Sequence, residues 1–158
     1  MKEVSIIIKN LKELLNGGHA HATFEQAVEK LPAKLQSQVP EGMPYSIWQL
    51  VEHIRITQFD ILEFSRDPDY ESPKWPEGYW PDERAPKNAA AWEESIRQIA
   101  NDRKAFIELL EAPRADLFTL FPHGSGQNLL REAMLIADHT SYHTGEIIVL
   151  RRLMGAWK

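Results

Sequence analysis

The stretch of sequence that decides the fold reads QNLLREAMLIADHTSYHTGEIIVLRRL and occupies residues 127–153. Its apolar residues return every three to four positions, as they do along one side of an amphipathic α-helix. A helix turns by about 100° per residue, so His139 and His143 project about 40° apart, on the apolar side. The segment therefore predicts a long helix that points two imidazole rings into the interior of a helical bundle.

These two histidines have few natural partners in such an interior. Their spacing of four residues places the rings side by side, one helical turn apart, and protonating both would be costly. A divalent metal ion resolves this conflict, because neutral imidazole nitrogens bind such ions. A lone buried histidine is more often a hydrogen-bonded core residue than a ligand, but the paired arrangement favours a metal site.

A zinc site needs at least three protein ligands, and His53 is the best third candidate. It lies in the middle of a second predicted helix, residues 47–64, for which Ser46 is the expected N-cap. On a helical projection it lies at the edge of the apolar stripe, next to the polar side that carries Asp60. Three histidines leave one coordination position open for water or substrate, as catalytic zinc sites do. The other histidines lie next to glycines or turns and are expected to be solvated, with His21 as the reserve ligand: His19, His21 and His123.

Two carboxylates of the last helix are candidates for a catalytic role. Glu132 and Glu146 project within about 20° of His139, one on each side along the helix axis. A carboxylate there could hold the second ring nitrogen of a histidine ligand or act on a metal-bound water. The alternative is that one or both pair with an arginine inside the bundle, such as Arg55 or Arg103.

The rest of the chain supplies the other helices of the bundle. Three further segments have helical spacing: 2–15, 23–39 and 88–111. Thr23 and Gln26 have the spacing of a capping box at the start of the second of these, and Pro32 is a candidate break within it. Ser125 is the expected N-cap of the last helix.

Residues 65–87 have a different character from the helical segments. They contain five of the ten prolines, together with Trp75, Tyr79 and Trp80. Proline removes backbone donors and blocks helix formation, so the segment predicts a long irregular crossover. Loops of this length usually bind or cover something, and we expect these aromatic side chains to pack on the helices and help cover a substrate cavity. The predicted fold is all-α. It is a four-helix bundle in which this crossover leads from helices two/three to the later helices.

Composition limits the classes of function. The 158 residues indicate a single domain over 1–158, and 18 basic against 23 acidic residues give a net charge of −5. This balance argues against binding to nucleic acid or to an anionic membrane surface. The chain contains no cysteine, which excludes disulfides, a thiolate metal site and a cysteine nucleophile. No stretch has the length of a membrane span or a signal-peptide core, so we expect a cytoplasmic protein.

Two segments resemble the motifs of the DinB/YfiT-like family of metalloenzymes: SIWQLVEHI at residues 46–54 and DHTSYHTGEI at residues 138–147. The first family motif places a histidine late in a helix start that contains Trp and Leu, and His53 matches it. The second is His-x-x-x-His followed by x-Gly-Gln-Ile, and His139 and His143 match it, with Glu146 in place of the usual Gln. The resemblance covers nearly the whole chain.

The resemblance implies a homodimeric four-helix bundle that holds a divalent ion, zinc or nickel, on His53, His139 and His143. Characterised relatives include thiol-dependent S-transferases and isomerases that use bacillithiol or mycothiol. Because the chain has no cysteine, the thiol would come from a low-molecular-weight cofactor. We therefore expect a metal-dependent thiol S-transferase that acts on small electrophiles. Two alternatives are a non-catalytic metal-binding or stress-associated bundle, and a bundle without metal whose histidines are satisfied internally.

Overall fold

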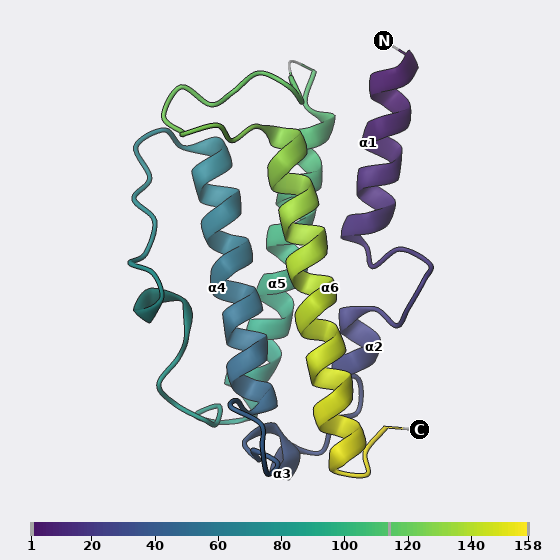
Figure 1. Cartoon of the computed structure of the whole chain (residues 1–158), viewed down its shortest axis with the longest axis vertical. Coiled ribbons are helices and arrows are strands. Elements are labelled where there is room, and N and C mark those ends of the chain that lie inside the picture. The colour runs from purple at the N-terminus through teal and green to yellow at the C-terminus, as the bar shows by residue number, and fades with distance from the viewer. Residues whose placement is uncertain (1, 114, 158) are drawn as a thin grey trace.

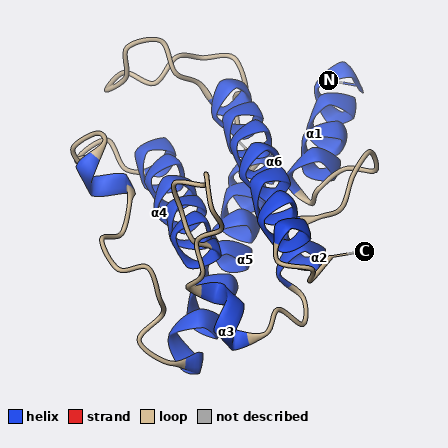
Figure 2. Cartoon of the chain, turned by 60° about the horizontal axis from the view of Figure 1, so that its bottom comes forward, coloured by secondary structure: helices blue, strands red, loops and turns tan. Residues whose placement is uncertain are grey.

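The computed structural model describes residues 2–113 and 115–157. Four long helices run alongside one another (Figure 1): α1 (Lys2–Leu15), α4 (Ile47–Arg66), α5 (Ala89–Glu111) and α6 (Leu129–Leu153). Shorter elements lie in the connections: α2 (Phe24–Val28), α3 (Ala33–Gln36) and the 3₁₀ helix η1 (Glu77–Tyr79). Every regular element within the described ranges is helical, without a strand (Figure 2), which confirms the predicted all-α class.

The four long helices enclose a common interior. α4 packs against α5 and α6, and α1 packs against the same two helices. One cluster of buried apolar side chains, around Ile54 and Ile147, includes residues of α2 and α3, and a second, around Leu62 and Phe106, includes residues of α1. Burying an aliphatic side chain contributes roughly 1.5–3 kcal/mol, so these clusters stabilise the bundle more than helix propensity does.

The ends of the helices follow the capping rules at most of the predicted positions. Thr23 forms the predicted capping box at the start of α2, and Ser46 is the predicted N-cap of α4, where Gln49 completes a second capping box. The expected cap of α6 was wrong. Asn128, not Ser125, accepts the hydrogen bond from the backbone N–H of Arg131, because α6 begins at Leu129, two residues after the predicted start at Gln127.

The segment 23–39 forms two short helices instead of one. Pro32 lies at the break between them as expected: it is the N-cap of α3, and Lys30, two residues earlier, has a φ of +53°. The predicted continuation to Val39 is wrong, since α3 ends at Gln36. Val39 precedes Pro40, and a residue before proline is disfavoured in the α conformation.

The crossover between α4 and α5 passes along the outer side of α4 (Figure 1), and its aromatic residues differ in burial. Tyr79 is 9% exposed and Trp80 is half-buried, so both pack inward as predicted. Trp75 is 67% exposed, which corrects the expectation that all three cover the helices. Its ring leans on Tyr79 at 5.3 Å between centroids, because Tyr79 already occupies the place against α4.

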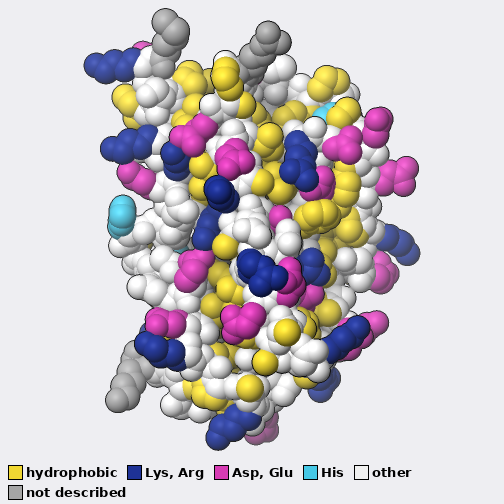
Figure 3. All heavy atoms as spheres, turned by 180° about the vertical axis from the view of Figure 1, so that it is seen from behind, with side chains coloured by type: hydrophobic (Ala, Val, Ile, Leu, Met, Phe, Trp, Pro, Cys, Tyr) yellow, Lys and Arg dark blue, Asp and Glu magenta, His cyan; other side chains and the backbone are white. Residues whose placement is uncertain are grey.

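The surface is mixed in charge. Seen from behind, Lys and Arg side chains are interspersed with Asp and Glu, with apolar areas between them (Figure 3). Neither sign of charge dominates this face. None of the described helices combines the length and the apolar character that crossing a membrane requires.

Two glycines provide opposite tests of the backbone. A Cβ at Gly145, in α6, would meet nothing within 4 Å, so Gly145→Ala should raise the free energy of unfolding by about 0.5–1 kcal/mol. Gly17 has a φ of +98°, and a Cβ there would lie 2.7 Å from Thr23 Cγ2. Gly17→Ala should therefore lower the free energy of unfolding by about 1 kcal/mol or more. Urea denaturation measures both, and a destabilising Gly145→Ala would contradict the open space at α6.

Candidate metal centre

Three histidines from two helices meet between α4 and α6. His53 comes from α4, and His139 and His143 come from successive turns of α6. One nitrogen from each ring lies within 4.8 Å of the other two. His53 and His143 are buried, at 3% and 7% exposed, and His139 is half-buried. The structure thus brings together the three predicted ligands, although His53 and His139 are separated by 86 positions in the chain.

Hydrogen bonds at the outer nitrogens orient two of the rings. His53 Nδ1 lies 2.8 Å from the carbonyl oxygen of Tyr79, and His143 Nδ1 lies 2.6 Å from Glu146 Oε2. Both partners accept hydrogen bonds, so each Nδ1 carries its hydrogen, and Nε2 is the nitrogen that each ring turns toward the cluster. His139 Nε2 lies 3.0 Å from His53 Nε2. The arrangement directs inner nitrogens at a common point.

The distance between the Nε2 atoms of His53 and His139 is close to that of two nitrogens bound to one small cation. Two imidazole nitrogens bound to the same zinc ion, each about 2.0–2.1 Å away in tetrahedral geometry, lie about 3.3 Å apart. The observed 3.0 Å between the Nε2 atoms of His53 and His139 needs only a small side-chain adjustment. Among the described residues, no fourth His, Asp or Glu joins the group. A cation held here would keep a position for a ligand from outside the protein.

Burial keeps the imidazoles of His53 and His139 neutral, as a metal ligand must be. It lowers the pKa of His53 to about 4, against a smaller raising effect of the hydrogen bond to Tyr79. Burial also lowers the pKa of His139 to about 3, and the neighbouring His143 and His53 lower it further. At neutral pH both rings therefore have free lone pairs, and binding a cation displaces no proton from either of them.

A stack of aromatic rings covers His53. The Trp80 ring lies 3.8 Å from the His53 ring, centroid to centroid, with 7° between the planes. Tyr45 stacks on Trp80 at 4.0 Å and 14°. This Tyr45–Trp80–His53 stack shields one side of the site from water and limits rotation of the imidazole. Sequence reasoning assigned a covering role to Trp80 but missed Tyr45, whose position before Ser46 carries no distinguishing signal.

A second contact ties the crossover to α4. The Tyr79 hydroxyl donates a hydrogen bond of 2.7 Å to Asp60 Oδ2, and Asp60 is 8% exposed. Burial, followed by this bond, raises the pKa of Tyr79. Asp60 follows His53 by seven residues, so the two share a face of α4. Tyr79 therefore contacts that face twice, with its hydroxyl and with its carbonyl, and its place could not be read from the sequence.

The two candidate carboxylates have different positions. Glu146 contacts the site through His143, as a partner of its outer nitrogen. Glu132 is 2% exposed and pairs with Arg131, without a described hydrogen bond to any of the three histidines. Burial raises the pKa of Glu132, more than Arg131 lowers it. A role for Glu132 at the site is therefore not supported by contact, because its side chain is turned to its neighbour in α6.

The arginines proposed as alternative partners are engaged elsewhere. Arg55 binds Glu52 one turn earlier in α4, at 2.8 and 2.9 Å. Arg103 binds Glu25 at 2.5 Å. The alternative that one of the two glutamates pairs with an arginine is confirmed for Glu132, but its partner is Arg131 and not Arg55 or Arg103.

The remaining histidines lie away from the three-histidine cluster. His21, the reserve ligand, contacts Ser141 Oγ at 2.8 Å, on the side of α6 opposite His139. His123 contacts the carbonyl oxygen of Phe64 at 2.8 Å, which corrects the expectation that it is solvated. The turn after α5 folds back on the end of α4, and this tertiary contact has no signature in the local sequence. His19 is exposed, as predicted.

The depressed pKa of His53 predicts how stability depends on pH. The pKa is about 4 in the folded chain against an ordinary 6.5, so the unfolded chain binds more protons between these values. Stability should fall as the pH drops through this window. For the metal-free protein, the free energy of unfolding should fall between pH 7.5 and pH 5.0 in wild type by about 2 kcal/mol more than it falls in His53→Gln. Urea denaturation in EDTA measures this difference, and equal losses would show that His53 is not held neutral by burial.

Comparison with known proteins agrees with this geometry. A family model described as the DinB superfamily matches residues 19–147, which is more than half of the chain and includes the three histidines of the site. Comparisons with curated proteins and with solved structures found no significant match. The match confirms the family resemblance, and the chain belongs to the DinB superfamily.

Proposed function

We propose that this protein is a metal-dependent enzyme that transfers a low-molecular-weight thiol to small electrophiles. In this proposal a divalent cation, zinc or nickel, is held by His53, His139 and His143. The observation that carries it is the convergence of three largely buried imidazole nitrogens, without a fourth acidic or histidine donor in the described group. Closed structural zinc sites use four protein ligands, whereas catalytic sites keep one position free.

The residues around the site suit this chemistry. A bound divalent cation supplies a positive charge that lowers the pKa of a thiol close to it. Glu146 accepts the hydrogen bond from His143 Nδ1 and so keeps Nε2 of that ring available. Trp80 and Tyr45 exclude water from the His53 side. The thiol must be a separate molecule, because the chain has no cysteine.

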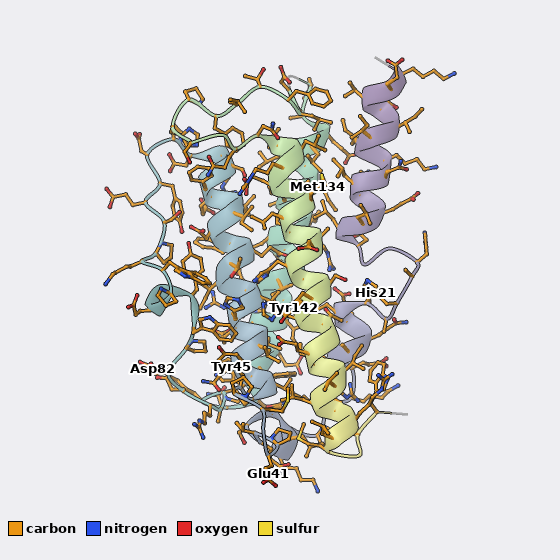
Figure 4. All side chains as sticks on the ribbon, in the orientation of Figure 1. His21, Glu41, Tyr45, Asp82, Met134 and Tyr142 are labelled. Carbon is orange, nitrogen blue, oxygen red and sulfur yellow. The ribbon has the colours of Figure 1, made fainter. Side chains whose placement is uncertain are left out.

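The transfer step itself is a simple displacement. The thiol loses its proton to solvent, and a sulfur lone pair forms a bond to the electrophilic carbon. The leaving group departs with the electron pair of the broken bond, so no oxidant or reductant is consumed. Tyr142, 65% exposed, lies beside His143 with 5.0 Å between ring centroids (Figure 4), and we place the approach of substrate next to it.

Metal content tests the ligand assignment. Untagged wild-type protein loaded with zinc or nickel and then dialysed should retain about one ion per chain. His143→Ala should retain less than about 0.1, because two imidazoles on their own do not complete a site. Plasma emission spectrometry measures the ratio.

Two variants control this experiment. His19→Ala removes an exposed histidine outside the cluster and should retain the metal. Glu146→Gln keeps an acceptor oxygen for His143 Nδ1 and should also retain it. Circular dichroism shows whether His143→Ala is folded. Equal metal content in wild type and a folded His143→Ala would contradict the proposed site.

Thiol transfer tests the activity. Bacillithiol added to cobalt-loaded protein should change the visible absorption, and the zinc-loaded protein should accelerate the reaction of bacillithiol with 1-chloro-2,4-dinitrobenzene. We expect about tenfold or more, because only a few per cent of a thiol of ordinary pKa is ionised at pH 7. Stopped-flow absorbance measures both.

The outcome distinguishes the two metal-binding hypotheses. Suppose that the protein retains metal, but that bacillithiol, mycothiol and glutathione all fail to change the spectrum and to react faster. This result would exclude the transferase and favour a metal that stabilises helix packing. His143→Ala serves as the matched protein blank in each assay. Acceleration that persists in this variant would show that the reaction does not use the site.

A further inference from the structure

The second half of the crossover is hydrogen-bonded along one face of α4. The carbonyl oxygens of Pro81 and Arg84 accept hydrogen bonds of 3.1 and 2.8 Å from side chains at the start of this helix. Tyr79 is bound twice, through its carbonyl oxygen and through its hydroxyl. The spacings of three, four and seven positions between the partners are those of a single helical face. The partners are Ser46, Gln49, His53 and Asp60.

Asp60 is the buried carboxylate at the end of this row. It is 8% exposed and accepts the hydrogen bond of 2.7 Å from the Tyr79 hydroxyl. Tyr70, from the first half of the crossover, lies close to it: burial, together with the negative charge of Asp60, raises the pKa of the Tyr70 hydroxyl to about 12. Burying a carboxylate is costly unless donors replace the lost water. Asp60 therefore attracts hydroxyl groups from both halves of the crossover.

Tyr79 connects Asp60 to a ligand of the candidate metal centre. Within the described residues, Asp60 makes no hydrogen bond with any of the three histidines, so its influence on them passes through Tyr79. The hydroxyl and the carbonyl belong to one buried residue, 9% exposed. Fixing the hydroxyl on Asp60 therefore limits where the carbonyl can lie, and the carbonyl is the partner of His53 Nδ1 at 2.8 Å.

The position of this carbonyl decides between two tautomers of His53. A neutral imidazole carries its hydrogen on either nitrogen. The Nε2–H form of His53 would donate to His139 Nε2, 3.0 Å away, so this tautomer also has a partner. It has no Nε2 lone pair for a cation, however. The Nδ1–H form prevails only while the Tyr79 carbonyl stays in place to accept that hydrogen.

We propose that Asp60 is a positioning residue of the metal centre. It holds the Tyr79 hydroxyl, which keeps the Tyr79 carbonyl on His53 Nδ1 and leaves His53 Nε2 free to bind a cation. The expected effect of Asp60 on metal affinity rests on the proposed metal site. Its effect on the tautomer of His53 requires no metal, so the two can be tested separately.

Two substitutions remove the same hydrogen bond from opposite ends. Tyr79→Phe deletes the hydroxyl but keeps the ring and the carbonyl, and Asp60→Ala deletes the carboxylate. Asp60→Asn keeps an acceptor oxygen for the hydroxyl and serves as the conservative variant. Ile61→Val is the matched control, because it destabilises the neighbouring, 5% exposed position of α4 without touching this hydrogen bond.

The tautomer of His53 is measured in the metal-free protein at neutral pH by long-range ¹H–¹⁵N spectra of the imidazole groups. The signals of His53 are those that disappear in His53→Gln. Wild type, Asp60→Asn and Ile61→Val should show mainly the Nδ1–H form. In Tyr79→Phe and Asp60→Ala the ratio of the Nδ1–H form to the Nε2–H form should fall about fivefold, which corresponds to losing the support of one hydrogen bond.

Zinc affinity is measured by competition with a chromophoric chelator. It should fall about tenfold in Tyr79→Phe and Asp60→Ala, as it does when the outer partner of a histidine ligand is disturbed. Asp60→Asn and Ile61→Val should bind zinc as wild type does. Circular dichroism shows whether each variant is folded, and Tyr79→Phe decides the question if Asp60→Ala is not.

Three results would overturn the proposal. The first is an unchanged His53 tautomer ratio in Tyr79→Phe and in folded Asp60→Ala. The second is an equal change in Ile61→Val, which would reflect general destabilisation of α4. The third is an altered tautomer ratio with unchanged zinc affinity. If wild type binds no zinc, the proposed function fails, and the tautomer ratios alone decide whether Asp60 positions His53.

Discussion

The hydrogen bond from His53 Nδ1 to the carbonyl oxygen of Tyr79 joins the long crossover to α4 at the three-histidine cluster. This bond decides which nitrogen of His53 points inward, because a carbonyl can only accept. The Tyr79 hydroxyl reinforces the same attachment by binding Asp60, two turns further along α4. Trp80, the next residue, is thereby placed on the face of the imidazole. Tyr79 and Trp80, in an otherwise irregular loop, therefore orient the imidazole of His53, cover it and shield it from water.

Helix α6 carries polar side chains on two opposite faces. His139 and His143 face α4, whereas Thr140 and Ser141 line a cavity of about 330 Å³ on the side of α1 and α2. Each side contains polar groups that a bundle interior would normally exclude. On the α4 side, burial lowers the pKa of His53 and of His139, so these two imidazoles are neutral at neutral pH. On the other side the Thr144 hydroxyl remains without a partner.

The predicted fold came from periodicity, and its errors lie where periodicity has no bearing. Apolar spacing identified the long helices, and the capping boxes at Thr23 and Ser46 located two helix starts. The start of α6 was misplaced because several residues before it could serve as a cap, and only the backbone geometry selects Asn128. Trp75 and His123 were misjudged for a similar reason. Whether a loop side chain packs or faces solvent depends on where the loop passes over the bundle, which local sequence does not encode.

The sequence by itself determined that two histidines share the inner face of one helix and that a third lies on the inner edge of another, since both follow from helical spacing within a single segment. It also determined that any thiol must come from outside the chain, because no cysteine is present. Only the tertiary structure decided that the three rings meet, that Glu146 rather than Glu132 contacts one of them, and that Tyr45 and Tyr79 complete the surroundings. The physical reason is that these contacts join residues far apart in the chain, and their formation depends on how the helices and the crossover pack against one another.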